Sequence, residues 1–502
     1  MPAMDTAPTI DDDARYLALC TRDARFDGRF FTGVTSTGIY CRPVCAVRTP
    51  RRANCRFFDH AAQAERAGFR PCLRCRPELA PQARTWSTQD AGDLLVQHAT
   101  RLLDDPAQWP GDDGPTVQRL ATRLGVSDRH LRRVFEARMG VSPLQVLHTR
   151  RLLAAKQLLA DTALPVTAVA QASGFASLRR FNAAFRDHYG LSPTALRRAG
   201  GAPSSHAVAL GWRPPLDVQA LLRFLADRLL PGVDAIDLEQ RRYWRTVRLP
   251  GAGGEHTGWI GLRFEPERHR VWLHASDGLL PSLPGLIWRV RALCDLDADP
   301  MAIDAVLGAD FPGGAGLRVP GALDGFELAV RAVLGQQVTV AAARTLAGRL
   351  VTRFGEAVST PDPTLNRLFP TPWALAEASP DALGQLGIVR QRQAAIQALA
   401  RAVAGGALDL SPHADPALTI DTLQGLPGIG AWTAHYIAMR ALRWPDAWPA
   451  GDVALHHALG IEGSPRARER ACDAHSQRWR PWRSYAVLRA WSGLHTPPGT
   501  RP

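Results

Sequence analysis

The sequence predicts a multidomain α+β protein with four parts: a small four-cysteine domain, an all-α double helix-turn-helix domain, a small α/β domain and a helical domain. Three observations support this prediction. Two close cysteine pairs lie near the N-terminus, a helical pattern then occurs twice, and a strand-rich stretch leads into a long helical region broken by Pro and Gly. A chain of 502 residues is long enough for each part to have its own core.

The charge of the chain indicates a polyanionic partner. Its formal net charge is +13, and most of the excess lies in the first 200 residues, as expected for segments that contact phosphates. No apolar run is long enough to span a bilayer, and residues 11–13 are acidic where a targeting signal would be basic. We therefore expect a cytoplasmic protein of the nucleoid with no membrane partner.

Two cysteine pairs at short spacing predict a metal site. Cys41 and Cys45 are separated by three residues, and Cys72 and Cys75 by two. Two such pairs, each presented by a turn, close a tetrahedral Zn²⁺ site, with free core thiols as the alternative. Cys20 and Cys55 have no partner at ligand spacing, so we expect them to be small buried apolar side chains.

The sequence around these cysteines closely resembles the N-terminal domain of Ada-type alkylation-response regulators. The matching segments are residues 37–45 (TGIYCRPVC) and 68–75 (GFRPCLRC). The resemblance implies that Cys41 irreversibly takes a methyl group from a DNA methylphosphotriester. A thiolate on Zn²⁺ stays ionised at neutral pH, and its methylation removes one unit of repulsion toward DNA phosphate. The alternative is a purely structural zinc site.

Several arginines flank the cysteines. Arg48 and Arg70 match family positions that approach the DNA backbone. The others can equally be solvated surface residues: Arg42, Arg51, Arg52 and Arg74.

The next block contains an internal repeat. Ser127, Leu131, Phe135, Gly140, Ser142 and Pro143 recur as Ser177, Phe181, Phe185, Gly190, Ser192 and Pro193. Each copy predicts a helix, a glycine turn, a second helix capped by serine and a stop at glycine. With the apolar stretch at residues 144–159, the repeat resembles the AraC-type DNA-binding domain. The resemblance implies that both second helices enter the major groove and that RNA polymerase is a partner.

The arginines of these second helices are equally placed to contact phosphates or to read bases. They are Arg132, Arg133, Arg179 and Arg180.

A flexible linker is predicted at residues 200–205, and a small α/β domain follows. Strands are expected from Val208 and at residues 243–249, 259–264 and 270–274. Helices are expected at residues 216–229 and 283–293.

A hairpin and a lone carboxylate dominate the C-terminal part. The segment at residues 426–434 (LPGIGAWTA) opens a helix, and Asp452 follows in WPAGDV at residues 448–453. Glycines at 428 and 430 permit a tight turn and a close approach, and bare N–H groups at a helix start bind anions. The alternative is an ordinary Gly-Pro turn. The two segments, with LGQQVTV at 334–340 and WRPWRSYA at 479–486, resemble helix-hairpin-helix DNA glycosylases of the AlkA type, which act on 3-methyladenine.

This resemblance implies a site for a flipped base. Trp432, Tyr436 and Trp491 match its aromatic pocket, with an ordinary aromatic core as the alternative. Asp452 would stabilise an oxocarbenium-like sugar and orient water, and it can also cap the following helix.

The resemblance also implies a DNA contact surface, made by Gln336, Gln337, Gly428 and Gly430. Two positions depart from the family: Gln337 stands near the duplex-plugging side chain, which can be Leu, and Gly451 replaces an acidic neighbour of the aspartate. Lys156 is the only lysine, so the C-terminal half has no amine for a Schiff base. Only Cys294 and Cys472 follow residue 200, too few for a four-cysteine iron–sulfur cluster.

The sequence thus predicts a damage sensor, a transcription activator and a monofunctional glycosylase in one monomeric chain that binds double-stranded DNA. Expected domains are 12–80 (zinc and methyl acceptor), 85–198 (double helix-turn-helix), 206–300 (small α/β) and 301–495 (helix-hairpin-helix glycosylase). The alternative is a regulator whose glycosylase-like half only binds damaged DNA.

Overall fold

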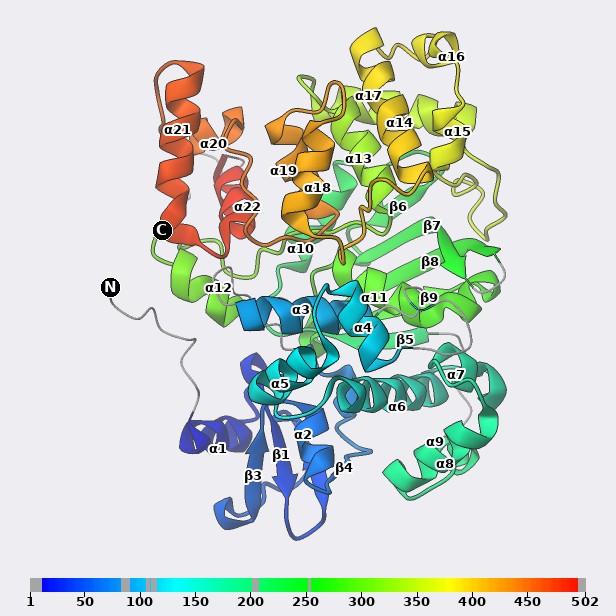
Figure 1. Cartoon of the computed structure of the whole chain (residues 1–502), viewed down its shortest axis with the longest axis vertical. Helices are drawn as coiled ribbons and strands as arrows, with labels where there is room; N and C mark the ends of the chain where they lie inside the picture. Colours follow the sequence, from blue (N-terminus) through cyan, green and yellow to red (C-terminus); the bar gives the residue numbers. More distant parts are fainter. Residues whose placement is uncertain are drawn as a thin grey trace.

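The computed structural model describes residues 11–82, 91–104, 109, 115–200, 207–251 and 254–494. Its elements confirm the predicted fold class, from an N-terminal four-cysteine cluster to a C-terminal helical domain. Figure 1 shows the N-terminal part at one end of the long axis and the C-terminal helices at the other. Among the described residues, no helix combines the length and apolarity needed to span a bilayer.

The N-terminal domain is a four-stranded sheet with short helices around it. Its strand order is β3-β1-β2-β4, in which only β2 and β4 pair in parallel. Its elements are α1 (Asp12–Thr21), η1 (Ala24–Phe26), β1 (Phe31–Val34), β2 (Ile39–Cys41), η2 (Arg52–Asn54), β3 (Cys55–Phe58), α2 (Ala61–Arg66), β4 (Arg70–Pro71) and η3 (Pro77–Leu79). Tyr40 pairs with Pro71, so the next residues along the two strands are Cys41 and Cys72. The parallel pair therefore brings the two cysteine pairs together.

The helical block confirms the predicted repeat. Its elements are α3 (Ala91–Asp104), α4 (Val117–Arg123), α5 (Asp128–Met139), α6 (Pro143–Asp161), α7 (Val166–Ala172), α8 (Leu178–Tyr189) and α9 (Pro193–Gly200). Ser127 and Ser177 cap α5 and α8, each with its hydroxyl accepting a backbone N–H at 3.3 Å. Gly140 and Gly190 end the same helices at φ +64° and +72°, a conformation that glycine adopts without strain.

The small α/β domain is an antiparallel sheet of order β5-β9-β8-β7-β6. Its elements are β5 (Ala207–Gly211), α10 (Val218–Ala226), β6 (Asp234–Asp237), β7 (Arg242–Gly251), β8 (Gly254–Glu265), η5 (Pro266–Arg268), β9 (Arg270–Ala275), η6 (Asp277–Ser282) and α11 (Leu283–Leu293). Strand β6 was not predicted, because all four of its residues are half-buried and show no alternation. Helix α9 runs to Gly200, and the rest of the predicted linker lies outside the described residues.

The C-terminal domain is helical and is built around α13, whose side chains are buried along almost its whole length. Its elements are α12 (Pro300–Leu307), α13 (Gly325–Leu334), α14 (Val340–Phe354), α15 (Pro372–Ala376), α16 (Pro380–Gly384), α17 (Arg390–Ala404), α18 (Pro416–Gln424), α19 (Ala431–Arg440), α20 (Val453–Ala458), α21 (Pro465–Ser476), η7 (Gln477–Trp479) and α22 (Arg483–Leu494).

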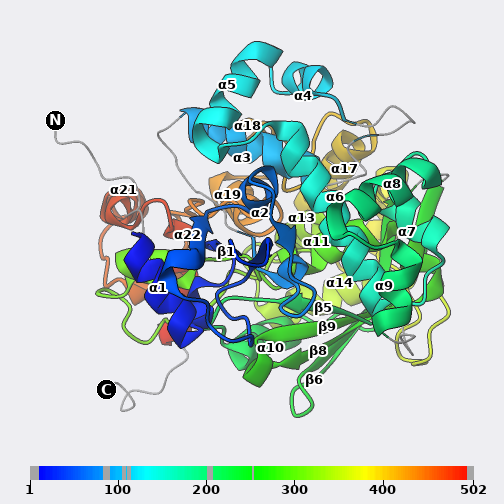
Figure 2. The ribbon, with the colours of Figure 1, turned by 90° about the horizontal axis from the view of Figure 1, so that it is seen from below.

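The second helix-turn-helix unit and the small sheet share one core. Buried residues of α6, α7 and α8, such as Leu159, Val169 and Phe181, belong to the same cluster as Val208 and Leu210 of β5. Figures 1 and 2 both place α6 next to β5, the edge strand of the sheet. The boundaries predicted at 85 and 206 fall on residues outside the described part, and they stay predictions.

Polar side chains of α6 satisfy this sheet edge. Gln157 donates to the carbonyl of Ala209 at 2.7 Å, and Asp161 accepts the amide of the same residue at 3.3 Å. An unpaired strand edge is a template for wrong pairing, and α6 closes it.

The N-terminal domain also contacts the C-terminal half directly. Arg213, fully buried just after β5, donates to the carbonyls of Asp27 at 2.8 Å, Pro81 at 3.0 Å and Asp297 at 2.8 Å. Arg29 adds an ion pair with Asp299. The four parts therefore pack as one body.

Candidate metal centre and candidate active site

The four predicted cysteines converge at the end of the β2–β4 pair. The sulfur atoms of Cys41, Cys45, Cys72 and Cys75 all lie within 4.8 Å of one another. The first three are buried and Cys75 is partly exposed. A tetrahedral Zn²⁺ site with metal–sulfur bonds of about 2.3 Å needs four thiolates this close together. The set therefore fits one Zn²⁺ ion.

The cluster is supported by an arginine that follows its first cysteine. The backbone N–H of Arg42 donates to Cys75 Sγ at 3.4 Å, and its Nη1 donates to the Cys75 carbonyl at 2.9 Å. The same guanidinium pairs with the buried carboxylate of Asp27. The interpretation of Arg42 as a solvated residue is therefore wrong. The sequence did not reveal these contacts, because the partners lie 15 and 33 residues away and leave no local pattern.

The two remaining N-terminal cysteines behave differently. Cys55 is buried, as predicted, and its thiol contacts the carbonyl of Arg51. Cys20 is exposed, so its predicted burial is wrong. It lies in the last turn of α1.

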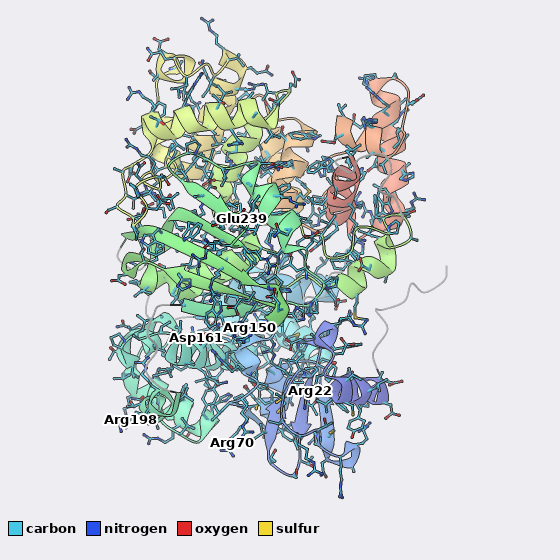
Figure 3. All side chains as sticks on the ribbon, turned by 180° about the vertical axis from the view of Figure 1, so that it is seen from behind. Arg22, Arg70, Arg150, Asp161, Arg198 and Glu239 are labelled. Atoms are coloured by element: carbon cyan, nitrogen blue, oxygen red, sulfur yellow. The ribbon has the colours of Figure 1, made fainter. Side chains whose placement is uncertain are left out.

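The predicted DNA-contacting arginines of the N-terminal half are all exposed: Arg48, Arg70, Arg132, Arg133, Arg179 and Arg180. Figure 3 shows Arg70 at the lower end of the molecule. The end of its guanidinium lies against Gly190, where an added Cβ would be 2.7 Å from Nη1. The N-terminal domain and the end of helix α8 therefore meet at this surface.

In the C-terminal half, Asp452 is held by donors from three helices. Trp432 Nε1 of α19 donates to Oδ2 at 2.7 Å, and Trp491 Nε1 of α22 donates to Oδ1 at 3.1 Å. The backbone N–H of Leu455 donates to Oδ1 at 2.8 Å, so Asp452 also caps α20. The carboxylate is only 8% exposed. Three donors fix both of its oxygen atoms beside the rings of Trp432 and Trp491.

The three predicted pocket aromatics lie together beside this carboxylate. Trp432 and Tyr436 are stacked, with ring centroids 5.4 Å apart and planes 7° apart, and Tyr436 is 6.4 Å from Trp491. Trp432 and Tyr436 are one helical turn apart, which places them on one face of α19. The sequence motif therefore indicated residues that the fold brings into one cluster.

Buried arginines hold Tyr436. Arg440 Nη1 donates to the Tyr436 hydroxyl at 2.8 Å, and burial lowers the pKa of Arg440 to about 10. Burial raises the pKa of Tyr436, but the guanidinium groups of Arg440, Arg228 and Arg331 outweigh it, and the pKa is lowered. The phenol oxygen of Tyr436 therefore accepts a hydrogen bond from Arg440 within the aromatic cluster.

The hairpin before α19 is tied to the loop between α13 and α14. Gly428 has φ +75°, and an added Cβ would lie 3.1 Å from that of Ala395 on α17. Gln336 donates from Nε2 to the Gly428 carbonyl and to Thr433 Oγ1, both at 2.9 Å. Gln337 is exposed in the left-handed conformation at φ +54°. The side-chain amide of Gln336 is thus hydrogen-bonded within the protein, whereas Gln337 faces outward.

Helix α19 starts after Gly430 without a side-chain cap among the described residues. Gly451, the second departure from the family, is exposed beside Asp452. Glu469 of α21 lies 4.0 Å from the position that a Cβ of residue 451 would take.

Comparison with known proteins identifies each part of this chain. Four family models match it: metal binding domain of Ada at residues 14–78, helix-turn-helix domain at 120–199, AlkA N-terminal domain at 207–324, and HhH-GPD superfamily base excision DNA repair protein at 330–484. A protein of Mycobacterium tuberculosis named "probable bifunctional transcriptional activator/DNA repair enzyme AlkA" is 40% identical over 97% of both chains. This chain belongs to that bifunctional Ada–AlkA family.

Two Escherichia coli proteins match this Ada–AlkA chain over shorter lengths. DNA-3-methyladenine glycosylase 2 is 36% identical over 56% of this chain and 95% of its own length. The bifunctional transcriptional activator/DNA repair enzyme Ada is 37% identical over 30% of this chain and 40% of its own. The family thus joins in one chain two parts that also occur as separate proteins.

Proposed function

We propose that this Ada–AlkA protein is an adaptive-response repair protein with two chemistries. A zinc-thiolate centre at Cys41 accepts methyl groups from DNA and activates transcription, and a monofunctional glycosylase at Asp452 excises alkylated bases such as 3-methyladenine. The observation that carries the second activity is the Asp452 carboxylate held by Trp432 and Trp491 at the edge of an aromatic cluster. The similarity to the Escherichia coli glycosylase supports the same activity.

Excision begins with a flipped nucleotide. The base stacks on the aromatic cluster while the sugar lies over Asp452. As the bond between C1′ and the base nitrogen breaks, its electron pair goes to the base, and the carboxylate stabilises the positive charge on the sugar. Water then attacks C1′, which leaves an intact strand with an abasic sugar. An N-alkylated purine is a cation that leaves as a neutral base, so it departs far more easily than a normal purine.

The Cys41 thiolate attacks the methyl carbon of a phosphotriester. A carbon–sulfur bond forms, the carbon–oxygen bond breaks, and the phosphate oxygen keeps the electron pair, so no proton transfer is needed. When bound, Zn²⁺ keeps the thiols ionised at neutral pH. Methylation removes one negative charge from the surface that faces DNA and so raises the affinity for phosphate. Arg48 and Arg70 are exposed and available to hold the backbone.

The transcriptional role uses the exposed arginines of α5 and α8, which are the second helices of the two helix-turn-helix units. Their side chains are available to phosphates and bases of the major groove. We propose that the methylated protein binds promoter DNA as a monomer and contacts RNA polymerase.

Two single substitutions in the full chain test both activities. Asp452→Asn keeps a side chain that caps α20 but removes the negative charge. It should lower the release rate of 3-methyladenine from alkylated DNA by about 100-fold or more, as the loss of an electrostatic stabiliser does, and leave methyl uptake unchanged. Cys41→Ser should abolish methyl uptake from phosphotriester DNA and leave excision intact.

The result for the wild type decides the alternative function. If the wild type and Asp452→Asn both release no base, the C-terminal half only binds damaged DNA. If Asp452→Asn releases base as fast as the wild type, the carboxylate is not the catalytic group.

A further inference from the structure

The only lysine of this chain is buried beside the metal centre. Lys156 lies on α6 and is 2% exposed. Its Nζ donates to the carbonyl of the zinc ligand Cys72 at 3.2 Å and to the Glu78 carboxylate at 2.6 Å. Helix α6 belongs to the helix-turn-helix domain, α4–α9, which we call the reading block. The ammonium of Lys156 nevertheless reaches the ligand loop of the N-terminal domain, which we call the acceptor domain.

Lys156 is part of a linked set of four charged side chains. Glu78, whose side chain is 1% exposed, also pairs with Arg76 at 2.9 Å. Arg76 in turn pairs with Asp161 of α6 at 2.7 Å. Figure 3 shows Asp161 on the teal helical block, just below the green sheet. Two positive and two negative groups thus connect both ends of the loop at residues 72–78 to one helix.

A second cation binds the other cysteine of this ligand pair. Arg42 donates to the Cys75 carbonyl, as Lys156 does to that of Cys72. Both cations are already paired with carboxylates, Asp27 and Glu78 respectively. Their common contact is a ligand carbonyl, and their effect is to fix the turn that presents the two sulfurs. One of these contacts comes from the acceptor domain itself and the other from the reading block.

The same face of α6 reaches the first cysteine pair as well. Thr149, two turns before Lys156, donates to the Glu65 carboxylate. Glu65 also accepts the hydroxyl of Tyr40 at 2.8 Å, and Tyr40 directly precedes Cys41. Helix α6 is therefore linked to the strand that ends at Cys41 and to the loop that starts at Cys72.

We propose that Lys156 is a positioning residue of the methyl-acceptor centre, supplied by the reading block of the same chain, so that the centre is complete only with α6 docked on it. This proposal rests on the proposed methyl-acceptor function of Cys41. A compact ammonium suits the role because it serves a carbonyl and a carboxylate in a small buried space. Helix α6 also joins the two helix-turn-helix units, so a change at the thiolates acts directly on the element that orients both.

The test uses full-length Lys156→Met, Lys156→Arg and the double variant Lys156→Met/Glu78→Gln. The double variant removes the buried carboxylate that Lys156→Met leaves short of a partner. Gln157→Met is the matched control, because Gln157 is a buried polar neighbour on α6 that faces β5. The readouts are the rate of zinc release to excess chelator, single-turnover methyl uptake, and release of 3-methyladenine as a measure of intact fold.

Lys156→Met and the double variant should release zinc about 10-fold faster or more, the range found for groups that support metal ligands. Methyl uptake should slow by a similar factor, while excision stays at the wild-type rate. The zinc-release and methyl-uptake rates of Lys156→Arg should lie between those of these two variants and the wild type. The rates of Gln157→Met should match the wild type.

The proposal is overturned if the double variant keeps zinc and takes up methyl at wild-type rates, since Lys156 would then be only a counter-ion of Glu78. If Lys156→Met fails to fold, as a loss of excision would show, the double variant and Lys156→Arg decide the question. If the wild type takes up no methyl, the proposed function of Cys41 fails, and the order of zinc-release rates still tests the role of Lys156.

Discussion

The two side chains proposed to react in this Ada–AlkA protein are held in opposite ways. Cys41 belongs to a cluster whose ligands all come from residues 41–75 and meet at the end of one strand pair. Asp452 is held by hydrogen bonds from α19, α20 and α22, whose donors span residues 432–491. The metal ligands of the first centre are local in sequence, whereas the hydrogen bonds of the second form only when distant helices have packed.

This difference has a functional consequence. At the cysteine centre the supporting groups, Arg42 and Lys156, contact ligand carbonyls and stay away from the sulfur that reacts. At the carboxylate the supporting groups, Trp432 and Trp491, are themselves the proposed walls of the base pocket. Positioning and substrate contact are separate in one centre and combined in the other.

The largest expected effect comes from removing both indole donors while keeping aromatic rings. Trp432→Phe/Trp491→Phe leaves Asp452 with the Leu455 amide alone. A hydrogen bond to a charged group contributes about 1.5–3 kcal/mol, so each loss should slow excision by about 10- to 100-fold. Single-turnover release of 3-methyladenine measures it, and methyl uptake by the same protein is the control. An equal fall in both activities would contradict the separation of the two centres.

The single variants sharpen the comparison. Trp432→Phe should slow excision more than Trp491→Phe, because its bond to Asp452 is shorter, 2.7 Å against 3.1 Å, and its ring stacks on Tyr436. The ratio of the two single-turnover rates gives the order directly. The reverse order would assign the main support of the carboxylate to α22.

A smaller effect is expected at the hairpin. Gly428→Ala places a side chain at φ +75° and 3.1 Å from Ala395, which should lower the free energy of unfolding by about 1–2 kcal/mol. Gly430→Ala is the matched control, since no atom lies within 4 Å of its added Cβ. Thermal unfolding and excision on alkylated duplex measure both variants. Equal losses in the two variants would show that the crowding at residue 428 is not what matters.

The last prediction is a negative result: borohydride should have no effect on excision. Because Lys156 is the only lysine and is buried in an ion pair with Glu78, no lysine amine is available to the sugar at Asp452. Borohydride added during excision should trap no covalent protein–DNA adduct. An adduct, or strand cleavage without heat or base, would overturn the monofunctional mechanism.

The sequence predicted the features whose signals are local or carried by a motif. The four cysteine ligands follow from spacing, the caps at Ser127 and Ser177 from the repeat, and the cluster of Asp452 with its aromatics from motifs in a fixed order. The contacts of Arg42 and Lys156 were missed, because pairing across 15 to 84 residues leaves no periodicity in the chain.

The shared core of the reading block and the small sheet was missed for a related reason. The pattern at residues 144–159 shows that the helix has an apolar side, but it does not identify the partner. Helix α6 is in fact buried on most sides, between the acceptor domain, both helix-turn-helix units and strand β5. Binary patterning indicates which residues avoid water, and tertiary packing decides what covers them.

The core shared by the reading block and the small sheet affects how the chain folds during synthesis. The ribosome delivers α6 and α7 before β5, β8 and β9 exist, so the nascent regulator carries an uncovered apolar surface until residue 275 has emerged. A chain that stops at the linker keeps that surface bare, together with the stranded side chains of Gln157 and Asp161. Such a fragment keeps both helix-turn-helix units, yet its exposed apolar surface makes it prone to self-association, so the two halves are best produced as one uninterrupted chain.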